Sequence, residues 1–257
     1  MISITNDRKK VRNILIIFFW LAIWQVASMF IQQELILVSP MVVAKTLFSL
    51  IGEKSFWSAI LYSFLRIVFG FLLAIIIGSF LSVISAASGA IRALLAPFFG
   101  VIKSIPVVSF IILVLIWTGS GNLSVVISFL MVLPIIYTNV LEGILRTDYK
   151  LLEMAQVFRV SFLRKLQAIY IPQTMPYFAS GCKVGLGLCW KSGIAAEVIG
   201  LPTGSIGEKL YQAKIFLNTG ELFSWTIVIV LISYLFEKLF LKLLSNFERS
   251  LERSINQ

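Results

Sequence analysis

The sequence predicts an all-α membrane protein that crosses the bilayer six times. Of its 257 residues, 59% are hydrophobic and only 13% are charged, and the mean hydropathy is +0.96. Several apolar runs approach the roughly 20 residues that a helix needs to cross a bilayer, which is not typical of a soluble domain. No internal repeat, low-complexity tract or linker divides the chain, so we expect a single transmembrane domain over residues 1–257.

The first two spans are expected at residues 14–30 and 57–84, and the second is most apolar at 71–83. The first apolar run is longer than the core of a cleavable signal peptide and lacks a clear small-residue cleavage site, so we expect it to be retained. Between these spans, residues 37–47 predict an external turn at Ser39-Pro40 and then a short amphipathic helix.

The third apolar run, residues 106–117, is short for a membrane span. We therefore expect its helix to begin upstream, in residues 90–103, and to break at Ile105-Pro106, because proline removes a backbone donor and kinks a helix. Irregular backbone is tolerated at membrane depth where protein covers it or where it lines a cavity. The remaining spans are expected at residues 123–145, 175–199 and 222–243.

The positions of lysine and arginine predict the orientation. These residues gather before the first span, in the loop after the fourth and after the last, which an even number of spans places on one face. Basic loops favour the cytoplasm, so both termini are expected there. The segments on the opposite face mix lysine with glutamate.

The loop after the fourth span, residues 146–172, predicts two short helices. Asp148 can cap a helix that runs to about Phe158, and Ser161 can cap the next one. Such a pair forms a compact basic and apolar protrusion that could dock into a groove on a soluble protein. The alternative is a solvated connector, since charge runs are commonly surface.

The sequence EMAQVFRVSFLRKLQAIYIP, from residue 153 to residue 172, resembles the coupling motif of bacterial ATP-binding-cassette importer permeases. That motif reads Glu-Ala-Ala, three residues, Gly, nine residues, Ile, an apolar pair and Pro. Four positions fall in register: Glu153, Ala155, Ile169 and Pro172. Met154 replaces the first Ala, and Arg159 replaces the Gly, which leaves the exact geometry of the turn open because arginine adopts positive φ only at a cost.

Further matches across residues 37–243 resemble the nitrate/sulfonate/taurine branch of that family. They include a Ser-Pro after the first span, an Arg and a Gly in the second, an Ile-Pro and a Trp-x-Gly in the third, and a glycine-rich helix that ends in Ala-Glu. In this chain these are Ser39-Pro40 with Val43 and Leu47, Arg66 and Gly70, Ile105-Pro106 and Trp117-Thr118-Gly119, and Gly181, Gly185, Gly187, Trp190 and Ala196-Glu197.

The resemblance implies an importer-permease fold with cytoplasmic coupling helices in a bacterial inner membrane. It implies a transport subunit, not an enzyme, that imports nitrate, sulfonates, taurine or a related small nitrogen or sulfur compound. The implied partners are an ATP-binding subunit, an extracytoplasmic solute-binding protein, a second permease copy and membrane lipid. The implied contacts with the ATPase are Glu153, Met154, Ala155, Arg159 and Pro172. The chain has no G-x-x-x-x-G-K-[ST] phosphate loop, so ATP hydrolysis is expected in another polypeptide.

The fifth span holds the candidate pathway residues. Lys183, Lys191 and Glu197 are ionisable, and such groups are costly against lipid and usually face a bundle interior or a cavity. Lys191 lies nearest the middle of the span and could attract an anionic substrate, with Trp190 and Glu197 as further candidates. The alternative is structural, with Lys191 paired to Glu197 or to backbone carbonyls. Lys183 lies nearer the cytoplasm and is expected to snorkel.

Two other functions remain as alternatives. A secondary transporter driven by an ion gradient often shows repeats and mid-membrane acids, whereas only Glu197 is a plausible intramembrane acid here. A membrane enzyme needs convergent catalytic groups, and the chain has no histidine. No cofactor or metal is expected. No nucleic-acid partner is expected either, because the positive charges do not cluster on a soluble module.

Overall fold

The computed structural model describes residues 3–255, which form ten α-helices and one π-helical turn joined by short connections. The all-α class predicted from the sequence is confirmed. The elements are α1 (Ser3–Ile31), α2 (Pro40–Ile51), α3 (Lys54–Ala87), α4 (Gly89–Ser104), α5 (Val107–Leu145), α6 (Tyr149–Val157), α7 (Phe162–Lys165), η1 (Leu166–Tyr170), α8 (Ile171–Gly200), α9 (Ile206–Ile215) and α10 (Thr219–Ile255).

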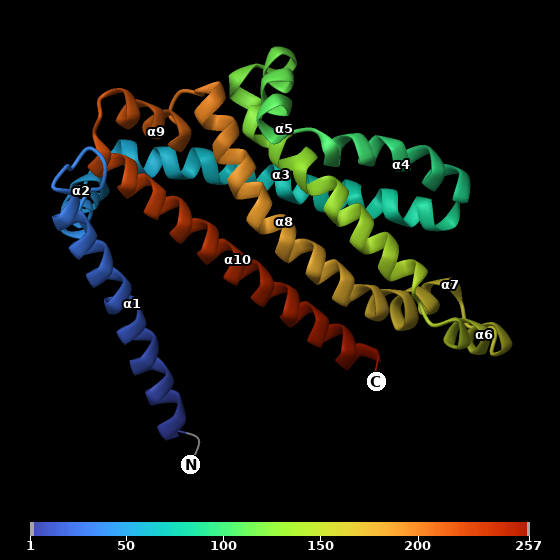
Figure 1. The fold of residues 1–257 in the computed structure, drawn as a ribbon. Coiled ribbons are helices and arrows are strands. Elements are labelled where there is room, and N and C mark those ends of the chain that lie inside the picture. The colour runs from blue at the N-terminus through green and yellow to red at the C-terminus, as the bar shows by residue number, and fades with distance from the viewer. Residues whose placement is uncertain (1–2, 256–257) are drawn as a thin grey trace.

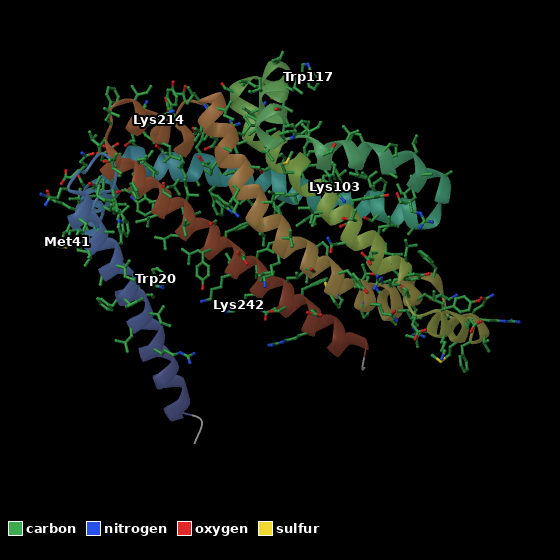
Figure 2. The ribbon with its side chains drawn as sticks, viewed as in Figure 1. Trp20, Met41, Lys103, Trp117, Lys214 and Lys242 are labelled. Carbon is green, nitrogen blue, oxygen red and sulfur yellow. The ribbon has the colours of Figure 1, made fainter. Side chains whose placement is uncertain are left out.

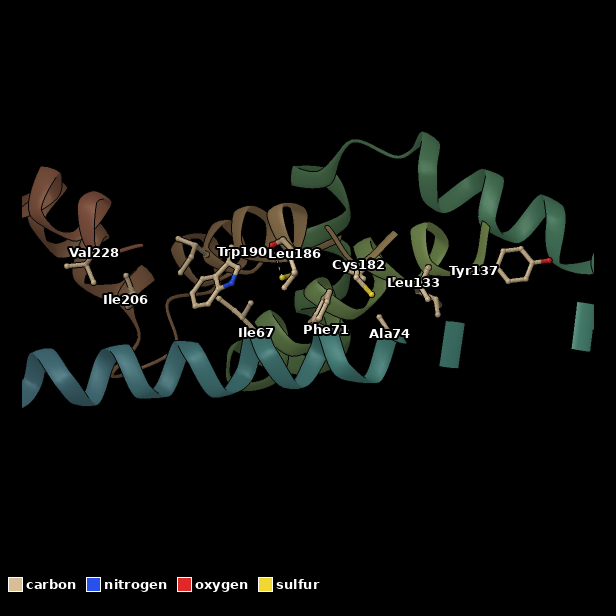
Figure 3. Packing of buried hydrophobic residues seen from close by; sticks show 14 of the residues in the cluster. Ile67, Phe71, Ala74, Leu133, Tyr137, Cys182, Leu186, Trp190, Ile206 and Val228 are labelled. Carbon is tan, nitrogen blue, oxygen red and sulfur yellow. Dashed lines mark hydrogen bonds between the residues drawn. The ribbon is translucent and has the colours of Figure 1, made fainter. Parts of the chain in front are cut away.

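The core lies where α3, α5 and α8 pack together, with α10 along one side (Figures 1 and 3). Ile67 and Phe71 of α3 are fully buried against residues of α5 and α8 such as Leu133 and Leu186. Phe240 of α10 closes this core with its ring centroid 5.2 Å from that of Phe71. Lipid is as apolar as these side chains, so close packing holds such helices together in a membrane.

Glycines permit the close approach of α8 to its neighbours. A Cβ at Gly193 would lie 2.6 Å from Ser128 Oγ of α5 and 2.7 Å from Ile67 Cγ1 of α3. A Cβ at Gly185 would lie 3.0 Å from Val132 Cγ1. Gly185 and Gly193 therefore act as packing residues, in keeping with the small residues found at helix contacts in membranes.

The predicted break at Ile105-Pro106 is confirmed. Helix α4 ends at Ser104, both residues of the break are extended with ψ 131°, and α5 begins at Val107. A second break was not predicted. Gly119 has φ 66° and ψ 173°, a conformation that is essentially restricted to glycine, and it bends α5 sharply. The third and fourth predicted spans are thus divided at Gly119.

The turn and short helix predicted near Ser39-Pro40 are confirmed. The Ser39 side chain accepts a hydrogen bond from the Val42 amide, and Pro40 occupies the first turn of α2, where its missing N–H is not needed. Helix α1 meets the rest of the molecule at this end, where the Trp24 indole donates to the Val38 carbonyl over 3.0 Å. Trp20, one turn nearer the start of α1 (Figure 2), is 63% exposed.

Two helices among the described residues, α3 and α5, are long and apolar enough to cross a membrane by length and composition. The segments Leu15–Ile31 and Pro40–Ile51 form shorter apolar helices. Helix α8 has 30 residues but includes Lys183, Lys191 and Glu197, which lower its apolar character. Figure 1 places both chain ends and α6 toward one end of the molecule, and α2 and α9 toward the other.

Candidate functional site

Residues 146–172, hereafter the coupling segment, contain α6, α7 and η1 and project beyond the ends of α5 and α8 (Figure 1). The cap predicted at Asp148 is confirmed, because its carboxylate accepts a hydrogen bond of 2.9 Å from the Lys150 amide. Helix α6 ends at Val157, with Phe158 as its C-cap. Ser161 precedes α7 in the expected N-cap position, but its side chain makes no capping hydrogen bond.

Arg159 stands in the left-handed region at the turn after α6, with φ 50°. The Val160 amide donates to the Ala155 carbonyl over 2.9 Å, and the Arg159 amide donates to the Gln156 carbonyl over 3.0 Å. These two bonds form a Schellman motif, whose left-handed position is usually glycine. The chain therefore forms a left-handed turn at a position where glycine is usual, although it carries arginine there.

The coupling segment is attached to the first turn of α8. The Asp148 amide donates to Gln173 Oε1 over 2.7 Å, one residue beyond Pro172. Ala155 and Ile169 are buried, with 3% and 8% of their surfaces exposed. Two of the motif residues thus anchor the segment. Glu153, in contrast, is exposed on α6 and available to another molecule.

Large apolar side chains are exposed on the coupling segment beside basic ones. A contiguous apolar patch with a polar rim marks a protein interaction site on a water-facing surface. The apolar members are Tyr149, Met154, Val157, Phe158, Phe162 and Leu163, each at least half exposed. Lys150, Arg159 and Arg164 are also exposed.

The three candidate pathway residues lie in different surroundings. Trp190 is only 2% exposed, and its ring centroid lies 6.0 Å from that of Phe64 and 6.4 Å from that of Phe236. Lys191 is exposed on the surface of the single chain, whereas Glu197 is fully buried. Trp190 and Glu197 of α8 therefore face the core, whereas Lys191 faces the surface of the chain.

The alternative pairing of Lys191 with Glu197 does not form among the described side chains. Residues six apart in a helix point about 120° away from each other around its axis, at about 100° per residue. Among the residues with described side chains, the ion pair that forms joins Arg146 to Glu142 over 2.7 Å. The carboxylate of Glu197 instead accepts hydrogen bonds from Ser63 Oγ and the Gly207 amide, over 2.6 and 3.3 Å.

Arg66 of α3 is a further candidate for the substrate pathway, which the family pattern marks without assigning it that role. Its Nη1 donates to Asn122 Oδ1 over 3.2 Å, and its Cζ lies 4.3 Å from the ring centroid of Tyr62. Both partners are uncharged, so several guanidinium donors remain for another acceptor. The sequence signal was available, because Arg66 is the one charged residue between Lys54 and Arg92.

Comparisons with known proteins agree with these features. A family model described as "Binding-protein-dependent transport system inner membrane component" matches residues 70–253. The taurine transport system permease protein TauC of Escherichia coli (strain K12) is 26% identical over 220 residues, covering 83% of this chain and 80% of the relative.

The nitrate import permease protein NrtB of Synechococcus elongatus is 28% identical over 206 residues, covering 76% of this chain and 73% of the relative. A solved amino acid ABC transporter with histidines has a similar fold, with a TM-score of 0.57 and 20% identity, over 76% of this chain and 94% of that one.

Proposed function

Because the chain belongs to the family of binding-protein-dependent transport system inner membrane components, we propose that it is the permease subunit of an ATP-driven importer for small anions. The observation that carries this proposal is the coupling segment. It projects from the helix bundle, caps its first helix at Asp148 and exposes Glu153 together with several large apolar side chains. A subunit without a nucleotide-binding loop needs such a surface to receive work from an ATPase.

The proposed topology has six spans with both termini in the cytoplasm. The spans are α1, α3, α4 with the first part of α5, the rest of α5, α8 and α10. The chain ends and α6 lie toward one end of the molecule, away from α2 and α9, which supports this path (Figure 1). Basic residues gather at this end: they lie at positions 8–12, in the coupling segment and toward the end of α10. This excess of lysine and arginine favours the cytoplasm for that end.

The proposed mechanism is alternating access without covalent chemistry. Two permease copies, forming a homodimer, enclose the pathway, and a solute-binding protein delivers the substrate from outside the cytoplasmic membrane of a bacterium. ATP binding in a separate subunit closes that subunit against the coupling segment. The segment is joined to α8 through Gln173, so its displacement is transmitted to α8 and to α3 and α5, which pack with it. A ligand then binds the two conformations with different affinities.

The proposed substrate class rests on the basic residues of the membrane helices. Lys191 is exposed on α8 with no partner among the described side chains, and Arg66 has only uncharged partners. Cations at membrane depth mark substrate pathways or need counter-ions. Relatives named for taurine and nitrate support an anionic substrate of this kind. We assign Lys191 to the pathway and Trp190, which is buried, to its packing support.

Copurification tests the proposal against its rival, a secondary transporter driven by an ion gradient. We expect the membrane-extracted protein to bring down an ATP-binding subunit, and Glu153→Lys to abolish ATP-dependent uptake while the permease stays in the membrane. Glu142→Lys is the control, because Glu142 is an exposed glutamate that lies before the coupling segment and pairs with Arg146. Uptake that follows an ion gradient and needs no ATPase would support the rival.

A further inference from the structure

A buried hydrogen-bonded group joins three helices at the end of the molecule opposite the coupling segment. Ser63 of α3 donates to Glu197 Oε2 over 2.6 Å, and its own oxygen accepts from the Ile206 amide over 2.9 Å. The Gly207 amide donates to the same Glu197 oxygen over 3.3 Å. All four residues are buried. We call Ser63, Glu197, Ile206 and Gly207 the Glu197 node.

The node attaches the first turn of α9 to the last turn of α8. Ile206 and Gly207 begin α9, and their amides are among those that a helix leaves without internal partners. A carboxylate is favoured at this position by the partial positive charge of a helix N-terminus. A Cβ at Gly207 would overlap the backbone and Cβ of Glu197, so the two helices touch at this point.

The connection between α8 and α9 is short and is held by its own contacts. Leu201 adopts the left-handed conformation, with φ 50°, directly after α8. Ser205 then caps α9 by accepting from the Glu208 amide over 3.0 Å, and the Gly204 amide donates to Glu208 Oε2 over 2.6 Å. These bonds order the start of α9, and the Glu197 node attaches that start to α8.

The opposite end of α8 is attached to the coupling segment. Its Gln173 accepts from the Asp148 amide over 2.7 Å, and Glu197 follows 24 residues later on the same helix. At 1.5 Å per residue, the two attachments lie about 36 Å apart along the helix axis. One helix therefore connects the segment that faces the ATPase to the short helix at the opposite end.

We propose that Glu197 is a positioning residue that fixes α9 to α8, so that α9 moves when the ATPase displaces the coupling segment. This inference rests on the proposed function for the identity of the two faces. Separation of α9 from α8 would remove the Gly207 donor from the buried Glu197 carboxyl group and leave the Ile206 and Gly207 amides without these partners, which is unfavourable. The node therefore makes α8 and α9 one moving body. Glu197 acts through helix position and does not contact the solute.

A cysteine at position 214 can report the movement of α9. Lys214 is exposed in the last turn of that helix (Figure 2), whereas the native Cys182 and Cys189 are fully buried. In the assembled transporter, we expect maleimide to label Lys214→Cys at rates that differ severalfold with and without ATP plus vanadate. No such difference in an otherwise unmodified permease would contradict the proposed function and this inference together.

Ser63→Ala then tests the node itself. We expect the nucleotide-dependent difference in labelling to fall by at least half, while ATP hydrolysis by the assembled transporter continues. Ser82→Ala is the matched control, because Ser82 is also a fully buried serine of α3, bonded to the Gly78 and Tyr137 carbonyls. We expect it to keep the full difference. A full difference in Ser63→Ala would overturn the inference and leave the proposed function standing.

Glu197→Gln keeps the test decisive if Ser63→Ala fails to assemble. Glutamine retains the shape and one acceptor oxygen but replaces the other oxygen with an amide nitrogen, which cannot accept the hydrogen bonds from Ser63 and Gly207. We expect a smaller nucleotide-dependent difference than in the unmodified protein, at an unchanged melting temperature of the assembled transporter. An undiminished difference in Glu197→Gln would overturn the positioning role.

Discussion

Ser63 and Glu197 are separated by 134 residues in the sequence, yet their side chains form a hydrogen bond of 2.6 Å in a fully buried position. This bond fixes the register of α3 against α8 and gives Glu197 a serine, not a lysine, as its side-chain partner. Lys191, on another face of the same helix, lies at the surface of the chain. The two ionisable residues of α8 thus have separate roles.

The first prediction compares two glycines of α8. Gly193→Ala should lower stability by about 1–3 kcal/mol, because its Cβ would lie 2.6 Å from Ser128 Oγ in a packed core. Gly187→Ala should raise it by roughly 0.5–1 kcal/mol, because no neighbouring atom lies within 4 Å and alanine favours helix. Thermal unfolding of both variants in nanodiscs measures the difference. Equal melting temperatures would refute the packing assignment.

The second prediction concerns the turn of the coupling segment. Arg159→Gly should relieve a left-handed backbone strain of roughly 1–2 kcal/mol. Part of this gain in stability is offset, because glycine increases the conformational entropy of the unfolded chain. Arg159→Val should destabilise the turn, because a β-branched residue resists φ near 50°. Hydrogen exchange at the Val160 amide reports the turn, and it should slow in the glycine variant and accelerate in the valine variant. Faster exchange in Arg159→Gly would contradict this account.

The third prediction concerns substrate charge. Lys191→Met should reduce uptake of an anionic substrate at least about tenfold, equivalent to about 1.4 kcal/mol, while the complex still hydrolyses ATP. Lys191→Arg should retain uptake, and Lys183→Met is the control because Lys183 is exposed on the same helix nearer the coupling segment. Taurine, an alkanesulfonate and nitrate are the probes. Normal uptake of a transported probe in Lys191→Met would eliminate the anion site and favour a neutral substrate.

The fourth prediction concerns topology. Reporter fusions after Gln257 and within residues 203–220 should report opposite sides of the membrane, since α10 separates them. The basic residues around α10 should hold its end in the cytoplasm. A reporter in the loop between α1 and α2 should agree with the one in 203–220. The same side for the first two fusions would exclude six spans.

Local rules predicted much of the fold. The break at Pro106, the start of α2 at Ser39-Pro40 and the cap at Asp148 each follow from the chemistry of one or two residues, and each is confirmed. The bend at Gly119 escaped prediction, because glycine permits a positive φ without requiring it. The family pattern marked the position without indicating its conformation.

The parts that could not be predicted depend on packing between distant segments. The contact of Arg66 with Asn122 joins residues 56 apart, and the Glu197 node depends on how α9 returns to α3. Helix periodicity alone places Lys191 and Glu197 on different faces, so their separation was accessible from the sequence. Only the structure shows that the Glu197 face is buried and the Lys191 face is exposed.

The account depends most directly on contact between the coupling segment and an ATPase. Val157 is 79% exposed on α6, and the native cysteines are buried, so Val157→Cys provides one reactive thiol. In membranes, a thiol-to-amine crosslinker should join it to the ATP-binding subunit, whereas Lys214→Cys at the opposite end should give no such product. A crosslink from position 157 alone is the result predicted here. A crosslink from position 214 alone, or from neither position in an active transporter, would contradict the account.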